Sequence, residues 1–129
     1  MAKVLLVDDE ASILSVLSVL LKAEGYEVLP VDNGEKAIEL IKSTPFDLMI
    51  SDIRMRPVDG IALLKAARET RPTMSVLMIT GYGTIETAVE SLKYGAFDYI
   101  TKPFKVDELL ITVQRAIEYN KTINENIDL

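Results

Sequence analysis

Short continuous hydrophobic runs alternate along the chain with segments in which hydrophobic residues recur every three or four positions. A continuous run is typical of a strand in a parallel sheet, because both faces of such a sheet are covered. A spacing of three to four is typical of a helix with one buried face. Strands are therefore expected at residues 3–7, 27–31, 46–52, 75–80 and 98–101, with a helix after each.

Residues that start or end helices stand at the borders of these segments. Asn33 and Thr84 have side chains that can cap a helix N-terminus. Gly25 and Gly95 can take the left-handed backbone conformation that commonly ends a helix, and Pro72 ends a third one. These signals support the same division of the chain into strands and helices.

Five strand–helix units in a row predict an α/β fold: a doubly wound, five-stranded parallel sheet with helices on both faces. Right-handed crossovers leave few ways to order the strands. We expect the flavodoxin-like order 2-1-3-4-5, which is taken from a known example of this architecture rather than worked out from the residues. Residues 1–118 are expected to form one domain, and residues 119–129 a polar C-terminal extension of the last helix or the start of a linker.

The composition narrows the chemistry that the chain can carry. There is no Cys and no His, which excludes disulfides, thiolate or imidazole metal ligands and a His general base. A bound metal must then have oxygen ligands, which favours Mg²⁺, Mn²⁺ or Ca²⁺. The net charge of −6 argues against a nucleic-acid surface, and no hydrophobic run approaches the ~20 residues that span a bilayer. We therefore expect a cytoplasmic protein without membrane contact.

Polar side chains follow the predicted strands at the ends that share one edge of the sheet. Taken alone, each has an ordinary explanation, because acids favour helix N-termini and most lysines are solvated. In a parallel sheet, however, these ends meet where α/β folds build their sites. The residues are Asp8 and Asp9 after the first strand, Asp52 at the end of the third, Thr80 at the end of the fourth and Lys102 after the fifth.

Such a cluster needs positive charge to hold it together. Two carboxylates ~4 Å apart repel each other by about 4 kcal/mol at an effective dielectric constant of 20. Lys102 supplies one positive charge, and an oxygen-ligated divalent cation supplies two. Mg²⁺ fits this role, with Mn²⁺ as a substitute, because it takes few carboxylates and shares phosphate oxygens. The sequence therefore predicts phosphoryl transfer with Asp52 as the nucleophile.

Four ordered stretches, at residues 4–10, 48–52, 78–81 and 98–104, resemble the receiver domains of two-component response regulators, the CheY-like family. The resemblance covers residues 1–118. It implies that Asp52 is the phosphoacceptor and that a sensor histidine kinase is the donor. It also implies that Asp9, Asp52 and the backbone carbonyl of Arg54 bind Mg²⁺ directly, with Asp8 acting through a water.

The resemblance assigns the remaining residues as well. Lys102 would contact the phosphoryl oxygens, with a cis Lys102–Pro103 bond, and Thr80 would hydrogen-bond the phosphoryl group. Tyr99 would be the switch aromatic, although an ordinary strand tyrosine is an alternative. The resemblance also places Arg54 and Tyr82, two positions after Asp52 and Thr80, beside the path of the hydrolytic water, and our own hypothesis is that these bulky side chains shield the acyl phosphate.

The stretch at residues 81–88 is similar to receivers of the nitrogen-regulator (NtrC) class. This likeness implies the N-terminal receiver of a transcriptional regulator, with an output and homodimer surface formed by helix 4, strand 5 and helix 5, roughly residues 84–119. Arg56 departs from the family, which usually has Pro there, so the loop path near the metal is an open point.

Other functions are alternatives to this one. A stand-alone receiver that acts by protein contact is the main alternative. A flavodoxin-like FMN carrier needs a hydroxyl-rich phosphate loop where this chain has acids, and a haloacid dehalogenase phosphatase needs Asp-x-Asp after the first strand. No turnover of a separate substrate is expected, only self-phosphorylation from a donor and self-dephosphorylation.

Overall fold

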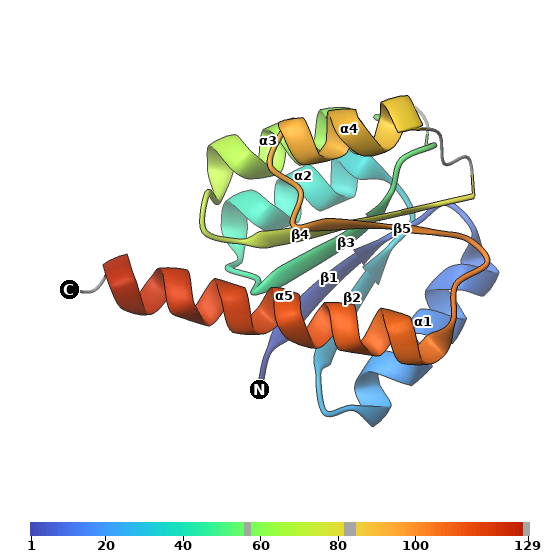
Figure 1. Cartoon of the computed structure of the whole chain (residues 1–129), viewed down its shortest axis with the longest axis horizontal. Coiled ribbons are helices and arrows are strands. Elements are labelled where there is room, and N and C mark those ends of the chain that lie inside the picture. The colour runs from blue at the N-terminus through green and yellow to red at the C-terminus, as the bar shows by residue number, and fades with distance from the viewer. Residues whose placement is uncertain (56–57, 82–84, 128–129) are drawn as a thin grey trace.

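The computed structural model describes residues 1–55, 58–81 and 85–127, with side chains described up to Thr122. Within these residues strands and helices alternate as expected, and each strand is followed by a helix (Figure 1). The elements are β1 (Lys3–Val7), α1 (Ala11–Ala23), β2 (Glu27–Val31), α2 (Gly34–Ser43), β3 (Leu48–Asp52), α3 (Gly60–Thr70), β4 (Ser75–Thr80), α4 (Ile85–Lys93), β5 (Asp98–Thr101) and α5 (Val106–Ile127).

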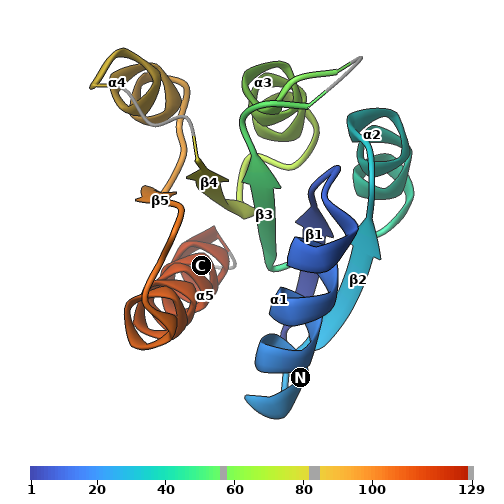
Figure 2. The same cartoon turned by 90° about the vertical axis from the view of Figure 1, so that its right-hand side faces the viewer.

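The strands form one parallel sheet in the order β2-β1-β3-β4-β5, which confirms the predicted order. Figure 2 shows the sheet between two layers of helices, with α2, α3 and α4 on one face and α1 and α5 on the other. Every strand pair is parallel. The carboxyl ends of the strands therefore lie at one edge of the sheet, as the candidate chemistry requires.

The helix borders follow from local chemistry. The Asn33 side chain accepts a hydrogen bond from the backbone N–H of Lys36 (2.9 Å) and caps α2, as predicted. Gly25 and Gly95 follow α1 and α4 with φ of 92° and 96°, the left-handed region in which glycine is unstrained. The predicted cap Thr84 lies outside the described residues.

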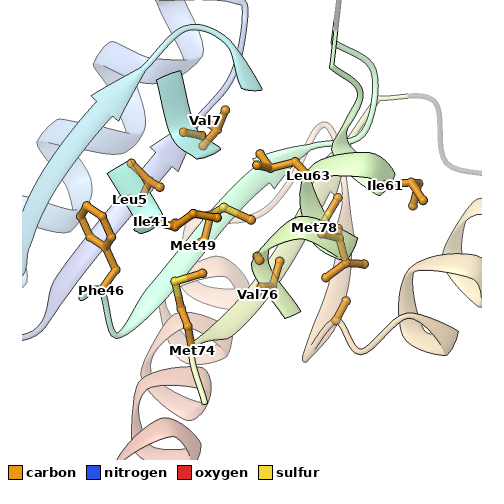
Figure 3. Packing of buried hydrophobic residues seen from close by; sticks show 14 of the residues in the cluster. Leu5, Val7, Ile41, Phe46, Met49, Ile61, Leu63, Met74, Val76 and Met78 are labelled. Atoms are coloured by element: carbon orange, nitrogen blue, oxygen red, sulfur yellow. The ribbon is translucent and has the colours of Figure 1, made fainter. Parts of the chain in front are cut away.

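Alternate residues of the central strands enter two separate cores. Leu5 and Val7 of β1 pack beneath α2 and α3, in the cluster drawn in Figure 3, whereas Val4 and Leu6 pack against α1 and α5. Met49 of β3 lies at the centre of the first cluster. Because both faces are buried, β1 and β3 carry continuous hydrophobic runs, which is why they were recognisable in the sequence.

The last helix continues well past the sheet. α5 runs to Ile127, and its C-terminal half is anchored by the buried Asn120, whose side-chain amide donates to the backbone carbonyl of Thr73 before β4. The polar residues 119–127 thus extend this helix, while the domain boundary at residue 118 stays a prediction. Among the described residues, no helix is long and apolar enough to span a bilayer.

Candidate functional site

The residues predicted from the strand ends converge at the carboxyl edge of the sheet. Asp52 is the last residue of β3 and pairs with Ile79 in register, and Thr80 ends β4 opposite Thr101 of β5. Lys102 follows β5 directly, and its backbone N–H donates to the carbonyl of Thr80 (2.8 Å). The sheet register therefore brings segments far apart in sequence to one point.

Lys102 is the positive centre of this site. Its Nζ lies 3.0 Å from Oδ2 of Asp8, 3.3 Å from Oδ2 of Asp52 and 3.6 Å from Oε1 of Glu10. The Lys102–Pro103 peptide bond is cis, as the resemblance predicted. One ammonium thus contacts three carboxylates that come from two different strand ends.

The Asp52 carboxyl group is buried, with 6% of its side chain exposed. Oδ2 faces Lys102, and Oδ1 accepts a hydrogen bond from the backbone N–H of Arg54 (3.3 Å). Burial raises the pKa of Asp52, the Lys102 charge lowers it and the Asp8 charge raises it again, so that the pKa lies above its usual value. Ionising this carboxyl group therefore costs more in the folded protein than in water.

The carboxylates around Lys102 stabilise its charged form. Burial lowers the pKa of its ammonium, but the hydrogen bond and charge of Asp8, together with those of Asp52, raise it by more, so that the pKa lies above its usual value. The lysine therefore stays charged. It can neutralise negative charge that develops on a neighbouring group.

The carboxylates fit a small divalent cation. One oxygen from each of Asp8, Glu10 and Asp52 lies within 4.8 Å of the others. Three carboxylates face one ammonium, so the site keeps an excess of negative charge that a hard cation with oxygen ligands would offset. The residues present therefore suit Mg²⁺, or Mn²⁺ in its place.

The two predicted acids after β1 have different positions. Asp8 is buried and contacts Lys102 directly, whereas Asp9 is exposed and lines a neighbouring pocket with Arg54 and Asp59. Glu10, for which the sequence predicts no role, is the third carboxylate near Lys102. Its signal was its place in the acidic run at residues 8–10, directly before α1.

Two other predicted residues lie near the edge. The Thr80 side chain is fully buried at the end of β4. Tyr99 of β5 is half-buried, and its hydroxyl lies 3.2 Å from Oγ1 of Thr87 on α4. The Arg54 side chain is exposed, whereas Tyr82 and Arg56 lie outside the described residues.

Gly60 holds the loop after Asp52 in place. Its N–H donates to the carbonyl of Ile53 (2.8 Å), which closes the β3–α3 connection. A Cβ at this position would lie 2.6 Å from Cα of Ile53 and closer still to the carbonyl oxygen of Asp52. Only glycine allows α3 to begin so near the end of β3, and this contact fixes the backbone that carries Asp52.

Comparison with known proteins agrees with this geometry. The family model described as "Response regulator receiver domain" matches residues 4–114. The chain is 40% identical to the transcriptional regulatory protein ZraR of Escherichia coli (strain K12) over 94% of this chain and 27% of ZraR. The chain spans about a quarter of the length of the first curated relatives that it matches.

Solved structures show the same fold. The crystal structure of NtrX from Brucella abortus in complex with ADP has a TM-score of 0.92 and 37% identity, over 99% of this chain and 30% of that one. The solution structure of the beryllofluoride-activated NtrC4 receiver domain dimer has a TM-score of 0.89 and 38% identity, over 93% of this chain and 99% of that one.

Proposed function

Because this chain belongs to the family of response regulator receiver domains, we propose that Asp52 accepts a phosphoryl group and that the chain acts as a phosphorylation-activated signalling switch. The observation that carries this proposal is the buried carboxylate at the end of β3, 3.3 Å from the Lys102 ammonium. A buried nucleophile beside a fixed positive charge suits phosphoryl transfer, in which positioning and charge neutralisation supply most of the catalysis.

The proposed donor is a phosphohistidine of a sensor histidine kinase. A carboxylate oxygen of Asp52 attacks the phosphorus, and an O–P bond forms as the N–P bond breaks. The electron pair of that bond stays on the imidazole nitrogen of the donor, which takes up a proton from solvent. Lys102 would neutralise the phosphoryl oxygens during this exchange, and Thr80 would hydrogen-bond one of them afterwards.

Mg²⁺ would be held by Asp52, Asp9 and the backbone carbonyl of Arg54, with Asp8 acting through a water. When bound, it would neutralise phosphoryl charge and orient the transferred group. The burial of Asp8 and its contact with Lys102 support its place in the pocket. Asp9 is exposed in this structure, so its direct role is a separate prediction from that of Asp52.

The output is proposed to pass through the surface of α4, β5 and α5. Tyr99 would turn inward behind Thr80 after phosphorylation, and the surface would then bind a second copy of the chain or an effector. α4 supports this role, because Ile85, Val89 and Leu92 are exposed on it. The names of the relatives favour control of transcription, with a stand-alone receiver as the alternative. The expected cytoplasmic location stays a prediction.

Acetyl phosphate can test the proposal without a kinase. The protein is incubated with acetyl phosphate and Mg²⁺, and its intact mass is measured. We expect the mass of one phosphoryl group to be added to wild type and to Asp107→Asn, an exposed acid in the first turn of α5, but not to Asp52→Asn. No added mass on wild type, or added mass on Asp52→Asn, would overturn the proposal.

A further inference from the structure

Glu10 belongs to the acidic cluster but has no part in the function proposed above. Its side chain is 58% exposed, against 4% for Asp8 and 6% for Asp52. Its backbone N–H donates to Oδ1 of Asp8 (2.9 Å), which fixes the residue at the start of α1. Although Glu10 is the N-cap of α1, its side chain makes no capping hydrogen bond. The carboxylate is instead within ion-pair distance of Lys102.

The contacts of Lys102 show what Glu10 does there. An ammonium has three protons to donate. Asp8 and Asp52 accept hydrogen bonds from Nζ at 3.0 and 3.3 Å, and Glu10 lies at an ion-pair distance of 3.6 Å. A phosphoryl group on Asp52 would need one of these donors. Asp8 and Asp52 are buried, and each accepts a backbone hydrogen bond through its second oxygen. Glu10 is exposed and is the most distant partner, so it is the one that can give way.

The same carboxylate adds to the negative charge that attracts a cation. Asp8, Glu10 and Asp52 place their oxygens within 4.8 Å of one another. Removing one of three negative charges weakens the pull on a divalent cation. It also reduces the repulsion of an anionic phosphodonor that approaches from the same side.

We propose that Glu10 is a positioning residue for Lys102 with two opposed effects: its charge tightens the binding of Mg²⁺, and its hold on Lys102 slows the phosphorylation of Asp52. The inference rests on the proposed function, because it assumes that Asp52 accepts the phosphoryl group. Replacing a residue that mattered only for the fold would lower both the affinity for Mg²⁺ and the rate of phosphorylation. Removing the charge of Glu10 is expected to lower the affinity and to raise the rate.

The test uses Glu10→Gln, which keeps the size of the side chain and removes its charge. We expect the dissociation constant for Mg²⁺, measured by calorimetry, to rise about two- to fivefold, the range that a partly exposed ion pair supplies. At saturating Mg²⁺, the rate of phosphorylation by acetyl phosphate should rise by a similar factor. Glu69→Gln is the matched control, because Glu69 is an exposed glutamate at the opposite end of α3 from Gly60. It should change neither quantity.

Glu10→Asp separates the two effects. The shorter side chain keeps the charge but withdraws it from Lys102, which is already 3.6 Å away. Mg²⁺ affinity should stay close to wild type, while phosphorylation becomes faster. If wild type binds Mg²⁺ and is phosphorylated but Glu10→Gln matches Glu69→Gln in both assays, this inference is wrong and the proposed function stands. If wild type gains no phosphoryl group, the proposed function is wrong, and this inference, which depends on it, is wrong as well.

Discussion

The Lys102 ammonium lies 3.3 Å from Oδ2 of Asp52, although the two residues are 50 positions apart. The contact joins the end of β3 to the segment after β5, which are not neighbouring strands in the sheet. Lys102 reaches across the end of β4 to make it. The contact therefore forms only when β3, β4 and β5 are correctly assembled. Changes at either residue should affect both the stability of the fold and the phosphorylation of Asp52.

Removing the negative charge of Asp52 is expected to stabilise the metal-free protein. The pKa of Asp52 is raised in the fold, chiefly by burial, so ionisation costs more in the folded chain than in the unfolded one. That cost appears as the pH rises through the unfolded pKa and is complete above the folded one. At neutral pH, Asp52→Asn should raise the melting temperature by about 4 °C, or ~1 kcal/mol for a domain of this size.

The control for this prediction is the metal. Mg²⁺ should stabilise wild type more than Asp52→Asn, because a ligand of the folded state at concentration c adds RT ln(1 + c/Kd) and therefore stabilises more the more tightly it binds. Calorimetric melting curves with and without Mg²⁺ measure both effects. A lower melting temperature for Asp52→Asn in metal-free buffer would contradict the prediction.

Removing the positive charge of Lys102 should have the opposite effect. Lys102→Met leaves the buried carboxylates of Asp8 and Asp52 without their ion pair. We expect a loss of about 2 kcal/mol in the free energy of unfolding, less than the roughly 3–5 kcal/mol of a fully buried pair, because some solvent reaches the ammonium. Denaturant unfolding measures the loss, and Lys105→Met, at an exposed lysine nearby, should cost much less.

The double variant tests whether the two residues act together. In the Asp52→Asn background, Lys102→Met should cost less than in wild type, because one of the repelling carboxylates is already gone. Equal costs in the two backgrounds would show that the contact contributes nothing to stability.

Gly60→Ala should displace the backbone that carries Asp52. The added Cβ would overlap the backbone of Asp52 and Ile53, so β3 and α3 must move apart. We expect a loss of about 1–3 kcal/mol in stability and a severalfold weaker affinity for Mg²⁺. Gly25→Ala is the matched control: φ of 92° strains that position, but it follows α1 far from the carboxylates. It should lower stability and leave Mg²⁺ affinity unchanged, and an unchanged affinity in Gly60→Ala would refute the positioning role.

The meeting of Lys102 and Asp52 was predictable because parallel strands deliver their ends to one edge. The strand order, which was taken from a known example of the architecture, and the cis Lys102–Pro103 bond, which the resemblance implied, are also as expected. Which side chain of the acidic run points inward was harder to predict. The chain leaves the sheet after Val7 and turns into α1, so the alternation of the strand no longer determines the direction of Asp8 or Asp9.

The contact of Glu10 with Lys102 was equally hard to predict from the sequence. Its carboxylate reaches Lys102 because α1 begins directly beside the strand end, a geometry that depends on the packing of the helix rather than on spacing in the sequence. A pattern of residues thus predicts which segments meet. The contacts of single side chains depend on how the connecting turn is built.

The lifetime of the acyl phosphate should depend on the side chains at positions 54 and 82. Arg54 is exposed two positions after Asp52, and Tyr82 has the same place after Thr80, outside the described residues. If both shield the phosphoryl group from water, Arg54→Ala and Tyr82→Ala should each shorten its lifetime severalfold. Phosphate release after removal of acetyl phosphate measures this, and lifetimes equal to wild type in both variants would remove the idea.

The hydroxyl of Tyr99 should couple β5 to α4 in the unphosphorylated state. It lies 3.2 Å from Oγ1 of Thr87, and one such hydrogen bond contributes about 1 kcal/mol. A double-mutant cycle with Tyr99→Phe and Thr87→Val should therefore give a coupling energy near this value. Both changes preserve the shape of the side chain, so the cycle isolates the hydrogen bond.

The same coupling energy can be measured again in the phosphorylated protein. If Tyr99 turns inward behind Thr80, its hydroxyl leaves Thr87, and the coupling should vanish in protein treated with acetyl phosphate and Mg²⁺. A coupling that stays the same after phosphorylation would make Tyr99 an ordinary strand tyrosine, since the residue would then not change partners with the state of Asp52. Because the cycle compares the same four proteins in two states, differences in their basal stability cancel, and the result depends on whether Tyr99 and Thr87 stay in contact.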